Sequence, residues 1–238
     1  MKGEFRQGID PFNTDAGGGE GYQYTTAGQY STEHVLARHL ELILAMAKLE
    51  GRSVIDVGCG DGFSTFRFWD RAHPARLAGV DPAENAIAVA NRKRGDRPIE
   101  FRVLGERVPF DDASFDVAIV QGVLHHADDP QHTIREALRV AREVVILEPN
   151  GLNPGLKLLE KVSPYHREHN ERSYSRRRLR GWIEAAGGRV VQEKFAVFVP
   201  IFSPSWLARA MAAVEPLVEA TPGVRAVSCS VQVIRATH

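Results

Sequence analysis

The feature that most constrains the fold of this 238-residue chain is a short apolar run that ends in closely spaced glycines. Residues 54–62 read VIDVGCGDG, with Gly58, Gly60 and Gly62 in the turn and a helical pattern beginning at Phe63. Glycine tolerates positive φ and lets a ligand approach the backbone, while the first turn of a following helix offers unpaired N–H groups. This order of strand, turn and helix indicates a ligand cradle. A plain tight turn is the simpler alternative.

Strand-like and helix-like segments alternate along most of the chain. Strands joined by helical crossovers form a parallel sheet with helices on both faces. We therefore predict one α/β domain over residues 32–238, preceded by a glycine- and tyrosine-rich arm over residues 1–31. Predicted strands cover 53–57, 76–80, 99–103, 114–120, 143–148, 189–199 and 226–234, and predicted helices cover 32–49, 63–70, 84–93, 131–141, 175–186 and 205–220.

Charge and cysteine content restrict the partners. The 30 basic and 30 acidic residues cancel, so no overall field attracts nucleic acid or an anionic membrane. Cys59 and Cys229 are too few for a disulfide framework. The N-terminus lacks the apolar run of a signal peptide, and no stretch is long enough for a membrane span. We expect a cytoplasmic protein with a small-molecule substrate, no nucleic-acid partner and no stable membrane insertion, and we leave a homodimer open.

A second acidic signal follows the glycine turn. Asp81 precedes Pro82 at the end of the next predicted strand. An acidic residue roughly 20 positions beyond such a turn can accept both hydroxyls of a ribose, which implies an adenosine ligand. Asp81 can also cap the helix that begins after Ala83, and the two roles are compatible.

The charge of the turn selects among adenosine ligands. Its spacing is G-x-G-x-G, and the carboxylates of Asp56 and Asp61 flank it. Two carboxylates repel a pyrophosphate, whereas they attract a ligand that carries sulfonium and ammonium groups. The turn therefore favours S-adenosylmethionine over a dinucleotide such as NAD.

Four motifs together resemble the class I S-adenosylmethionine-dependent methyltransferases, within the broad type 11-like group that acts on small molecules. They are VIDVGCGDG at 54–62, GVDPA at 79–83, VPFDDASFDVAIV at 108–120 and VLHHADDP at 123–130. The resemblance covers residues 53–149. It implies a Rossmann-like three-layer sandwich with a seven-stranded, mostly parallel sheet, and S-adenosylmethionine as cofactor. Its sheet order separates Cys59 from Cys229, so we expect two free thiols.

The resemblance also implies cofactor contacts. Gly58, Cys59 and Gly60 would line the methionyl part and Asp56 would lie near its amino group. Family members carry an acidic adenine contact where this chain has Leu104, so Glu106 is the substitute we expect. The full set of expected cofactor residues is Asp56, Gly58, Cys59, Gly60, Asp81, Pro82, Gly105, Glu106 and Gln121.

A histidine pair is the candidate for catalysis. His125 and His126 follow the predicted fourth strand, beside the expected cofactor site. Histidine titrates near neutrality, so either residue can act as a general base, and a role in fixing the loop is the alternative. Methyl transfer is an in-line displacement, in which the protein mainly aligns nucleophile and methyl group.

The expected substrate side is less regular. An insertion over residues 150–174 follows the predicted fifth strand and concentrates polar side chains; a solvated surface loop is the alternative. A cap segment over residues 197–222 is apolar and can cover the pocket, form a dimer contact or lie at a lipid interface. Tyrosines of the arm can close over the ligand. The expected substrate contacts are Tyr22, Tyr30, Glu148, Asn150, His166 and His169, and we expect no metal site.

These observations lead to one function and its rivals. We expect methyl transfer to a small polar or glycosylated metabolite, with oxygen as the favoured acceptor. The alternatives are transfer to nitrogen or carbon of a quinone-like or lipid-like substrate, and a non-catalytic scaffold or regulator that binds the cofactor.

Overall fold

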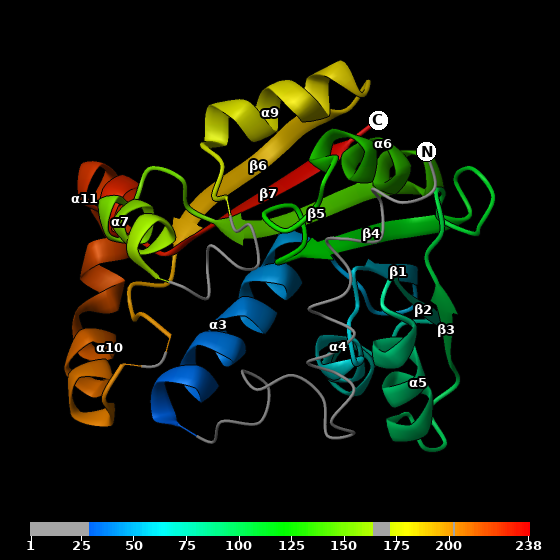
Figure 1. Ribbon diagram of the computed structural model, residues 1–238, viewed down its shortest axis with the longest axis horizontal. Helices are drawn as coiled ribbons and strands as arrows, with labels where there is room; N and C mark the ends of the chain where they lie inside the picture. The colour runs from blue at the N-terminus through cyan, green and yellow to red at the C-terminus, as the bar shows by residue number, and fades with distance from the viewer. Residues whose placement is uncertain (1–28, 164–171, 202) are drawn as a thin grey trace.

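The computed structural model describes residues 29–163, 172–201 and 203–238, which form a sheet between two layers of helices (Figure 1). The sheet has seven strands in the order β3-β2-β1-β4-β5-β7-β6. The first five positions are parallel, and β7 lies antiparallel to both neighbours. This confirms the predicted fold. The strands are β1 Ser53–Val57, β2 Arg76–Asp81, β3 Ile99–Val103, β4 Phe115–Gln121, β5 Ala141–Pro149, β6 Arg189–Ala196 and β7 Val231–Thr237.

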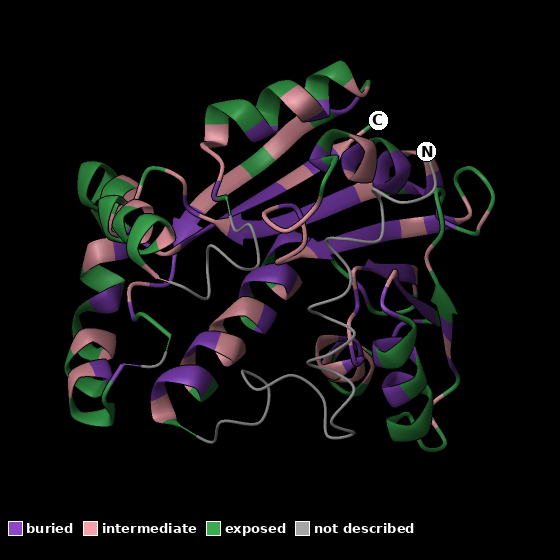
Figure 2. Ribbon diagram, in the orientation of Figure 1, coloured by how far each residue is buried: buried purple, intermediate pink, exposed green. Residues whose placement is uncertain are grey.

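Apolar residues on both faces of the central strands create two cores. Val54 of β1 belongs to one core and its neighbour Ile55 to the other, because successive strand residues point to opposite faces. Val117 and Ala118 of β4 divide in the same way. The central strands are therefore buried on both sides, as Figure 2 shows.

Each core is closed by its own helices. Residues from α3 Tyr30–Met46, α4 Phe63–Ala72, α5 Glu84–Lys93 and α10 Ser205–Ala220 contribute to the first core. Residues from α6 Pro130–Val140 and α9 Arg176–Ala185 contribute to the second, on the opposite face (Figure 1). Two shorter helices, α7 Pro154–Val162 and α11 Pro222–Ser228, lie at one end of the molecule.

Three predicted boundaries are wrong. The strand predicted over 189–199 ends at Ala196. The first helix begins at Tyr30, inside the predicted arm, because Tyr30 packs on the core and stacks on His34. The predicted strand over 226–234 is displaced: residues 222–228 form α11, which Pro222 starts at its first helical turn, and β7 begins at Val231. The register of β7 against β5, with Ile146 opposite Ile234, sets the position of that strand.

The order of the strands indicates where in the sheet a ligand site is expected. β1 lies between β2 and β4, so the chain leaves β1 toward one side of the sheet and later returns to the other. Ligands of open parallel sheets bind outside the carboxyl ends of the strands at this reversal. The glycine turn after β1, Asp81 at the end of β2 and the histidine pair after β4 all lie there.

Candidate active site

The glycine turn after β1 is held in a conformation that requires glycine. Gly58 has φ of 81°, and a Cβ added to it would lie 2.2 Å from Val123 Cγ2. The N–H groups of Gly58 and Cys59 donate to Val80 O, at 2.7 and 3.0 Å. The turn therefore bends tightly over β2 and leaves bare backbone at the site.

Asp81 ties that turn to the next helix. Its Oδ2 accepts the N–H of Gly60 at 2.8 Å, and its Oδ1 accepts the N–H of Ala83 at 2.8 Å. Burial raises the pKa of Asp81 to about 6, although these hydrogen bonds lower it. Asp81 thus fixes the residue directly before α5 and lines the pocket described below, although it does not cap the helix itself.

Asp56 lies deeper than the expected ligand contact. Its side chain is buried and accepts the hydroxyl of Thr65 from α4 at 2.6 Å. Burial raises the pKa of Asp56 to about 7, and the nearby Asp81 carboxyl raises it further while Thr65 lowers it. Asp61, also buried, lies 3.4 Å from Lys93 Nζ. Asp56 does not line the pocket, so the predicted direct contact with the ligand's amino group stays a prediction.

A pocket opens between the carboxyl ends of β1, β2 and β4. Seven of the residues predicted from the sequence line it: Gly58, Gly60, Asp81, Pro82, Gly105, Glu106 and His126. Cys59, Gln121 and His125 lie outside this lining. The lining also contains residues that sequence reasoning missed, among them Val57, Ala83, Val108, Gly122, Val123, Asp128, Asp129, His132 and Thr133.

The pocket wall around Leu104 contains several acidic residues. Leu104 lines the pocket with Glu106, and so do Asp128 and Asp129 from the loop before α6. The backbone carbonyl of Glu106 accepts His132 Nε2 at 2.7 Å, which joins the two loops. Residues 127–130, which read ADDP and follow the histidine pair, are the part of the sequence that could have revealed Asp128 and Asp129.

The pocket fits S-adenosylmethionine. Bare backbone at Gly58 and Gly60 admits a ligand, and the buried carboxyls of Asp56 and Asp81 are stabilised in their charged form by a nearby cation. Leu104 and Val108 supply an apolar wall of the kind that an adenine ring packs on.

Glu148 has a structural role instead of the predicted substrate contact. Its Oε1 accepts the N–H groups of Val123 and Leu124, at 2.7 and 2.8 Å, and its Oε2 lies 2.8 Å from His125 Nδ1. The side chain is 1% exposed. Glu148 holds the loop after β4 in place because both of its carboxylate oxygens are occupied there.

Asn150 also differs from its prediction. Its amide donates to Ala226 O and Cys229 O, both at 2.9 Å, and its side-chain oxygen accepts the N–H of Leu152 at 3.0 Å. The residue is fully buried. It joins the end of β5 to α11 and the residue after it, because both of its amide N–H groups donate to backbone carbonyls there.

The other predicted substrate residues lie elsewhere. Tyr30 lies in α3, with Arg209 over its ring at 4.2 Å. Tyr22, His166 and His169 lie outside the described residues, as does most of the predicted arm. The insertion contains α7, and its two ends meet at a bridge between Asn150 and Tyr174.

The histidine pair lies beside the pocket. The rings of His125 and His126 have centroids 3.9 Å apart, and His126 lines the pocket. Glu148 accepts the Nδ1–H of His125, which leaves the lone pair on Nε2 in that tautomer. A buried carboxylate that orients an imidazole is a suitable arrangement for a general base.

Cysteine, metal and membrane features complete the site description. Cys59 and Cys229 are free and buried. Among residues 29–163, 172–201 and 203–238, no group of three or more His, Cys, Asp or Glu side chains could hold a metal ion. No helix in these same ranges is both long and apolar enough to cross a bilayer.

Two curated relatives share the central part of the chain. The tRNA U34 carboxymethyltransferase of Nautilia profundicola is 34% identical over 112 residues, covering 45% of this chain and 33% of the relative. The 27-O-demethylrifamycin SV methyltransferase of Amycolatopsis mediterranei is 32% identical over 116 residues, covering 46% of this chain and 42% of the relative. The matches thus span less than half the length of either relative.

A solved structure matches nearly the whole chain. It is a complex between the Trm112 methyltransferase activator of Haloferax volcanii and a methyltransferase, and the matched chain has a TM-score of 0.67 at 19% identity. The match covers 95% of this chain and 96% of that one. The likeness shows that the fold extends beyond the central motifs.

The family comparison agrees with the geometry. Residues 55–147 match the model of a methyltransferase domain family. That segment runs from β1 to β5 and includes the glycine turn, Asp81 and the histidine pair. Residues 55–147 are therefore similar to a methyltransferase domain, and the rest of the chain shares the fold of a solved methyltransferase structure.

Proposed function

We propose that this protein transfers the methyl group of S-adenosylmethionine to an oxygen atom of a small polar or glycosylated metabolite. One observation carries the choice of oxygen: His126 lines the pocket and its ring lies against that of His125, which the buried Glu148 orients. A hydroxyl is a poor nucleophile until its proton is removed, so it needs such a base, whereas an amine needs much less help.

Each group of residues has a separate task in this proposal. When bound, S-adenosylmethionine supplies an activated methyl group. The backbone of Gly58 and Gly60 admits the ligand, and the Asp56 and Asp81 carboxyls stabilise its positive charge. His126 at the pocket wall, or His125 behind it, accepts the proton of the acceptor hydroxyl. Where His125 is the base, Glu148 stabilises the imidazolium that forms.

The choice of a small acceptor rests on charge. The chain has no net charge, and the pocket wall includes the acidic residues Glu106, Asp128 and Asp129, which disfavour a phosphate backbone at the site. One curated relative acts on tRNA by its name and the other on a rifamycin, so both substrate classes belong in the assay.

The test is methyl transfer from labelled S-adenosylmethionine to a panel of hydroxylated and glycosylated metabolites, amines, quinols and bulk tRNA. We expect label in an ether or ester product. His125→Gln or His126→Gln should lower kcat by about 100-fold or more, with loss of the limb of the pH profile that reports the base. His73→Gln, on the far end of α4, is the control and should keep full activity.

Other outcomes would replace the proposal. Label on nitrogen, carbon or tRNA would change the acceptor class. Tight binding of S-adenosylmethionine in calorimetry, with no transfer to any acceptor, would favour the scaffold alternative. A flat pH profile in the unmodified protein would remove the general base.

A further inference from the structure

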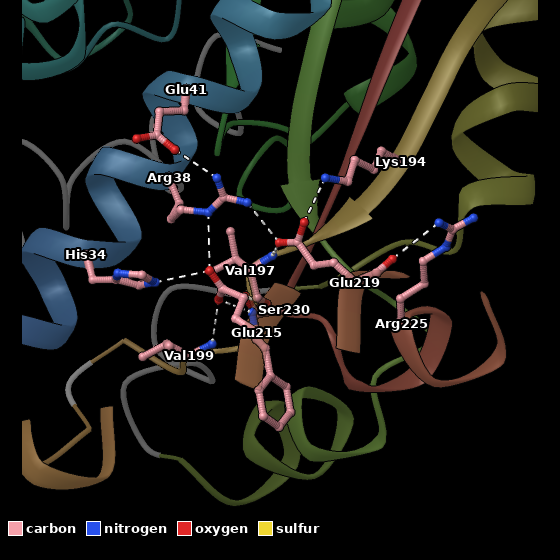
Figure 3. A network of polar contacts seen from close by, with 11 residues as sticks. His34, Arg38, Glu41, Lys194, Val197, Val199, Glu215, Glu219, Arg225 and Ser230 are labelled. Carbon is pink, nitrogen blue, oxygen red and sulfur yellow. Dashed lines mark hydrogen bonds and ion pairs between the residues drawn. The ribbon is translucent and has the colours of Figure 1, made fainter. Parts of the chain in front are cut away.

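The helix α10 is anchored by charges on the side that faces the protein (Figure 3). Glu215 accepts hydrogen bonds from His34 at 3.1 Å, from Arg38 at 3.2 Å and from the N–H of Phe198 at 2.7 Å. The Glu215 side chain is 5% exposed. A carboxylate so fully paired binds the helix to α3 and to the segment after β6.

Glu219, one turn further along α10, makes the same kind of contact. It accepts Arg38 at 3.0 Å, Lys194 at 2.7 Å and the N–H of Val197 at 3.0 Å. Its side chain is 8% exposed. Both acidic residues of α10 are therefore turned inward, which reverses the usual arrangement of a surface helix.

The outer side of α10 is apolar. Trp206 is 73% exposed, Leu217 is 71% exposed and Val214 is 46% exposed. Their spacing places them on one face of the helix, and the exposed Ala210 and Ala213 lie between them. Continuous apolar surface of this kind marks an interaction site.

Two neighbouring helices extend this surface. α7 and α11 lie beside α10 at the same end of the molecule (Figure 1), and Asn153 at the start of α7 donates to Ser228 O of α11 at 3.1 Å. Both helices are largely exposed in Figure 2. We call the whole surface the apolar end face; its members are Leu158, Leu159, Val162, Trp206, Val214, Leu217, Val224 and Val227, all at least 41% exposed.

The charged side chains that α7, α10 and α11 expose are positive. Lys161 of α7 and Arg209 of α10 are exposed. The acids of these helices are unavailable, because Glu215 and Glu219 are buried and Glu160 is paired with Lys157 and Ser173. An apolar surface that contains a tryptophan can enter the headgroup region of a membrane, and basic residues at its rim are attracted to anionic lipids.

We propose that the apolar end face docks the protein on the surface of a membrane that contains anionic lipids. A second copy of the chain fits less well, because a two-fold contact through this face would bring two copies of the same basic rim together. The docking is peripheral and leaves the fold unchanged, because the anchoring carboxylates lie on the opposite side of α10.

The test is co-sedimentation of the full chain with vesicles of phosphatidylcholine alone and of phosphatidylcholine mixed with phosphatidylglycerol. We expect binding to the mixed vesicles that weakens as salt is added. The double variant Trp206→Gln/Leu217→Gln should lower the partition coefficient about tenfold or more, because two large apolar side chains no longer enter the interface. Lys161→Gln should weaken binding to the mixed vesicles by a smaller factor.

Matched variants separate docking from folding. Val103→Gln changes an exposed apolar residue of the edge strand β3, 44% exposed, and should bind vesicles like the unmodified protein. Trp206→Phe should keep binding but lose the blue shift of tryptophan fluorescence that vesicles cause. All variants should retain their urea midpoint and their affinity for S-adenosylhomocysteine.

Three results would overturn the proposal. The first is absence of binding to mixed vesicles at low salt. The second is an equal loss of binding in Val103→Gln. The third is a concentration-dependent dimer in sedimentation velocity that Trp206→Gln/Leu217→Gln abolishes, which would make a second copy the occupant.

Discussion

Two buried pairs of carboxylates in this molecule differ in how they are neutralised. The turn pair, Asp56 and Asp81, accepts its described hydrogen bonds from neutral donors, namely a threonine hydroxyl and two backbone N–H groups. The helix pair, Glu215 and Glu219, is bound by His34, Arg38 and Lys194 as well as by backbone N–H groups.

The pKa values of Asp56, Asp81 and Glu219 reflect this difference in hydrogen-bond donors. Burial raises the pKa of both turn carboxyls, to about 7 for Asp56 and about 6 for Asp81. Burial also acts on Glu219, but Lys194, the Val197 N–H and Arg38 outweigh it and lower the pKa. A buried carboxyl without a cationic side chain favours a cationic ligand, whereas a saturated one holds elements together.

The largest effect is expected at the helix pair. Glu215→Ala removes the acceptor of Arg38 Nε and of two backbone N–H groups in the segment after β6, so the free energy of unfolding should fall by about 3 kcal/mol. Urea unfolding measures it. Glu41→Ala removes an exposed carboxylate from the same arginine and should cost less than about 1 kcal/mol. Equal losses would mean that burial does not distinguish these partners.

The next effect is a pH dependence at the turn pair. Because the pKa of Asp56 is raised from 3.8 to about 7 in the folded chain, its protonation stabilises the fold at low pH, and this contribution is lost as pH rises through about 7. Asp56→Asn keeps an acceptor for Thr65 and removes the charge. Without ligand, the free energy of unfolding of the variant relative to that of the unmodified chain should rise by more than about 1 kcal/mol from acidic to neutral pH. If the free energies of unfolding of the two proteins, measured in urea, changed equally with pH, the pKa of Asp56 would not be raised.

A third prediction concerns ligand affinity at the same pair. Asp81→Asn removes the charge that faces the pocket, so the affinity for S-adenosylmethionine should fall about tenfold or more in calorimetry. Asp70→Asn, an exposed carboxylate of α4 paired with Arg97, should bind normally. If both variants kept full affinity, the turn pair would be no more functional than the helix pair.

The smallest effects on stability are expected at two lysines, one beside the helix pair and one beside the glycine turn. Lys194 contacts Glu219 at 2.7 Å, and Lys93 contacts Asp61 at 3.4 Å, with side chains 38% and 40% exposed. Either Lys→Gln change should cost less than about 1 kcal/mol, because water screens partly exposed cations, and Lys194→Gln should cost more than Lys93→Gln. The reverse order in thermal or urea unfolding would show that the turn depends on a cation of its own.

The sequence alone predicted where the glycine turn, Asp81 and the histidine pair lie. The glycine turn, Asp81 and the histidine pair are local signals, and each lies at the carboxyl end of a strand whose apolar run is easily recognised. The predicted substrate residues Glu148 and Asn150 were misread, because a polar residue after a buried strand has the same pattern whether it binds a ligand or the backbone. Only the structure shows that Val123, Leu124 and Cys229 use those side chains.

The sequence by itself determined the alternation of strands and helices from β1 to β5 and the acidic glycine bend, because these depend on residues close together in the chain. Tertiary structure decided which charges are satisfied. Arg38 and Glu215 are 177 positions apart, and packing alone turns the carboxylates of α10 inward and leaves Trp206 exposed. Burial and pairing between distant residues set the energy of a charge, and no local pattern encodes them.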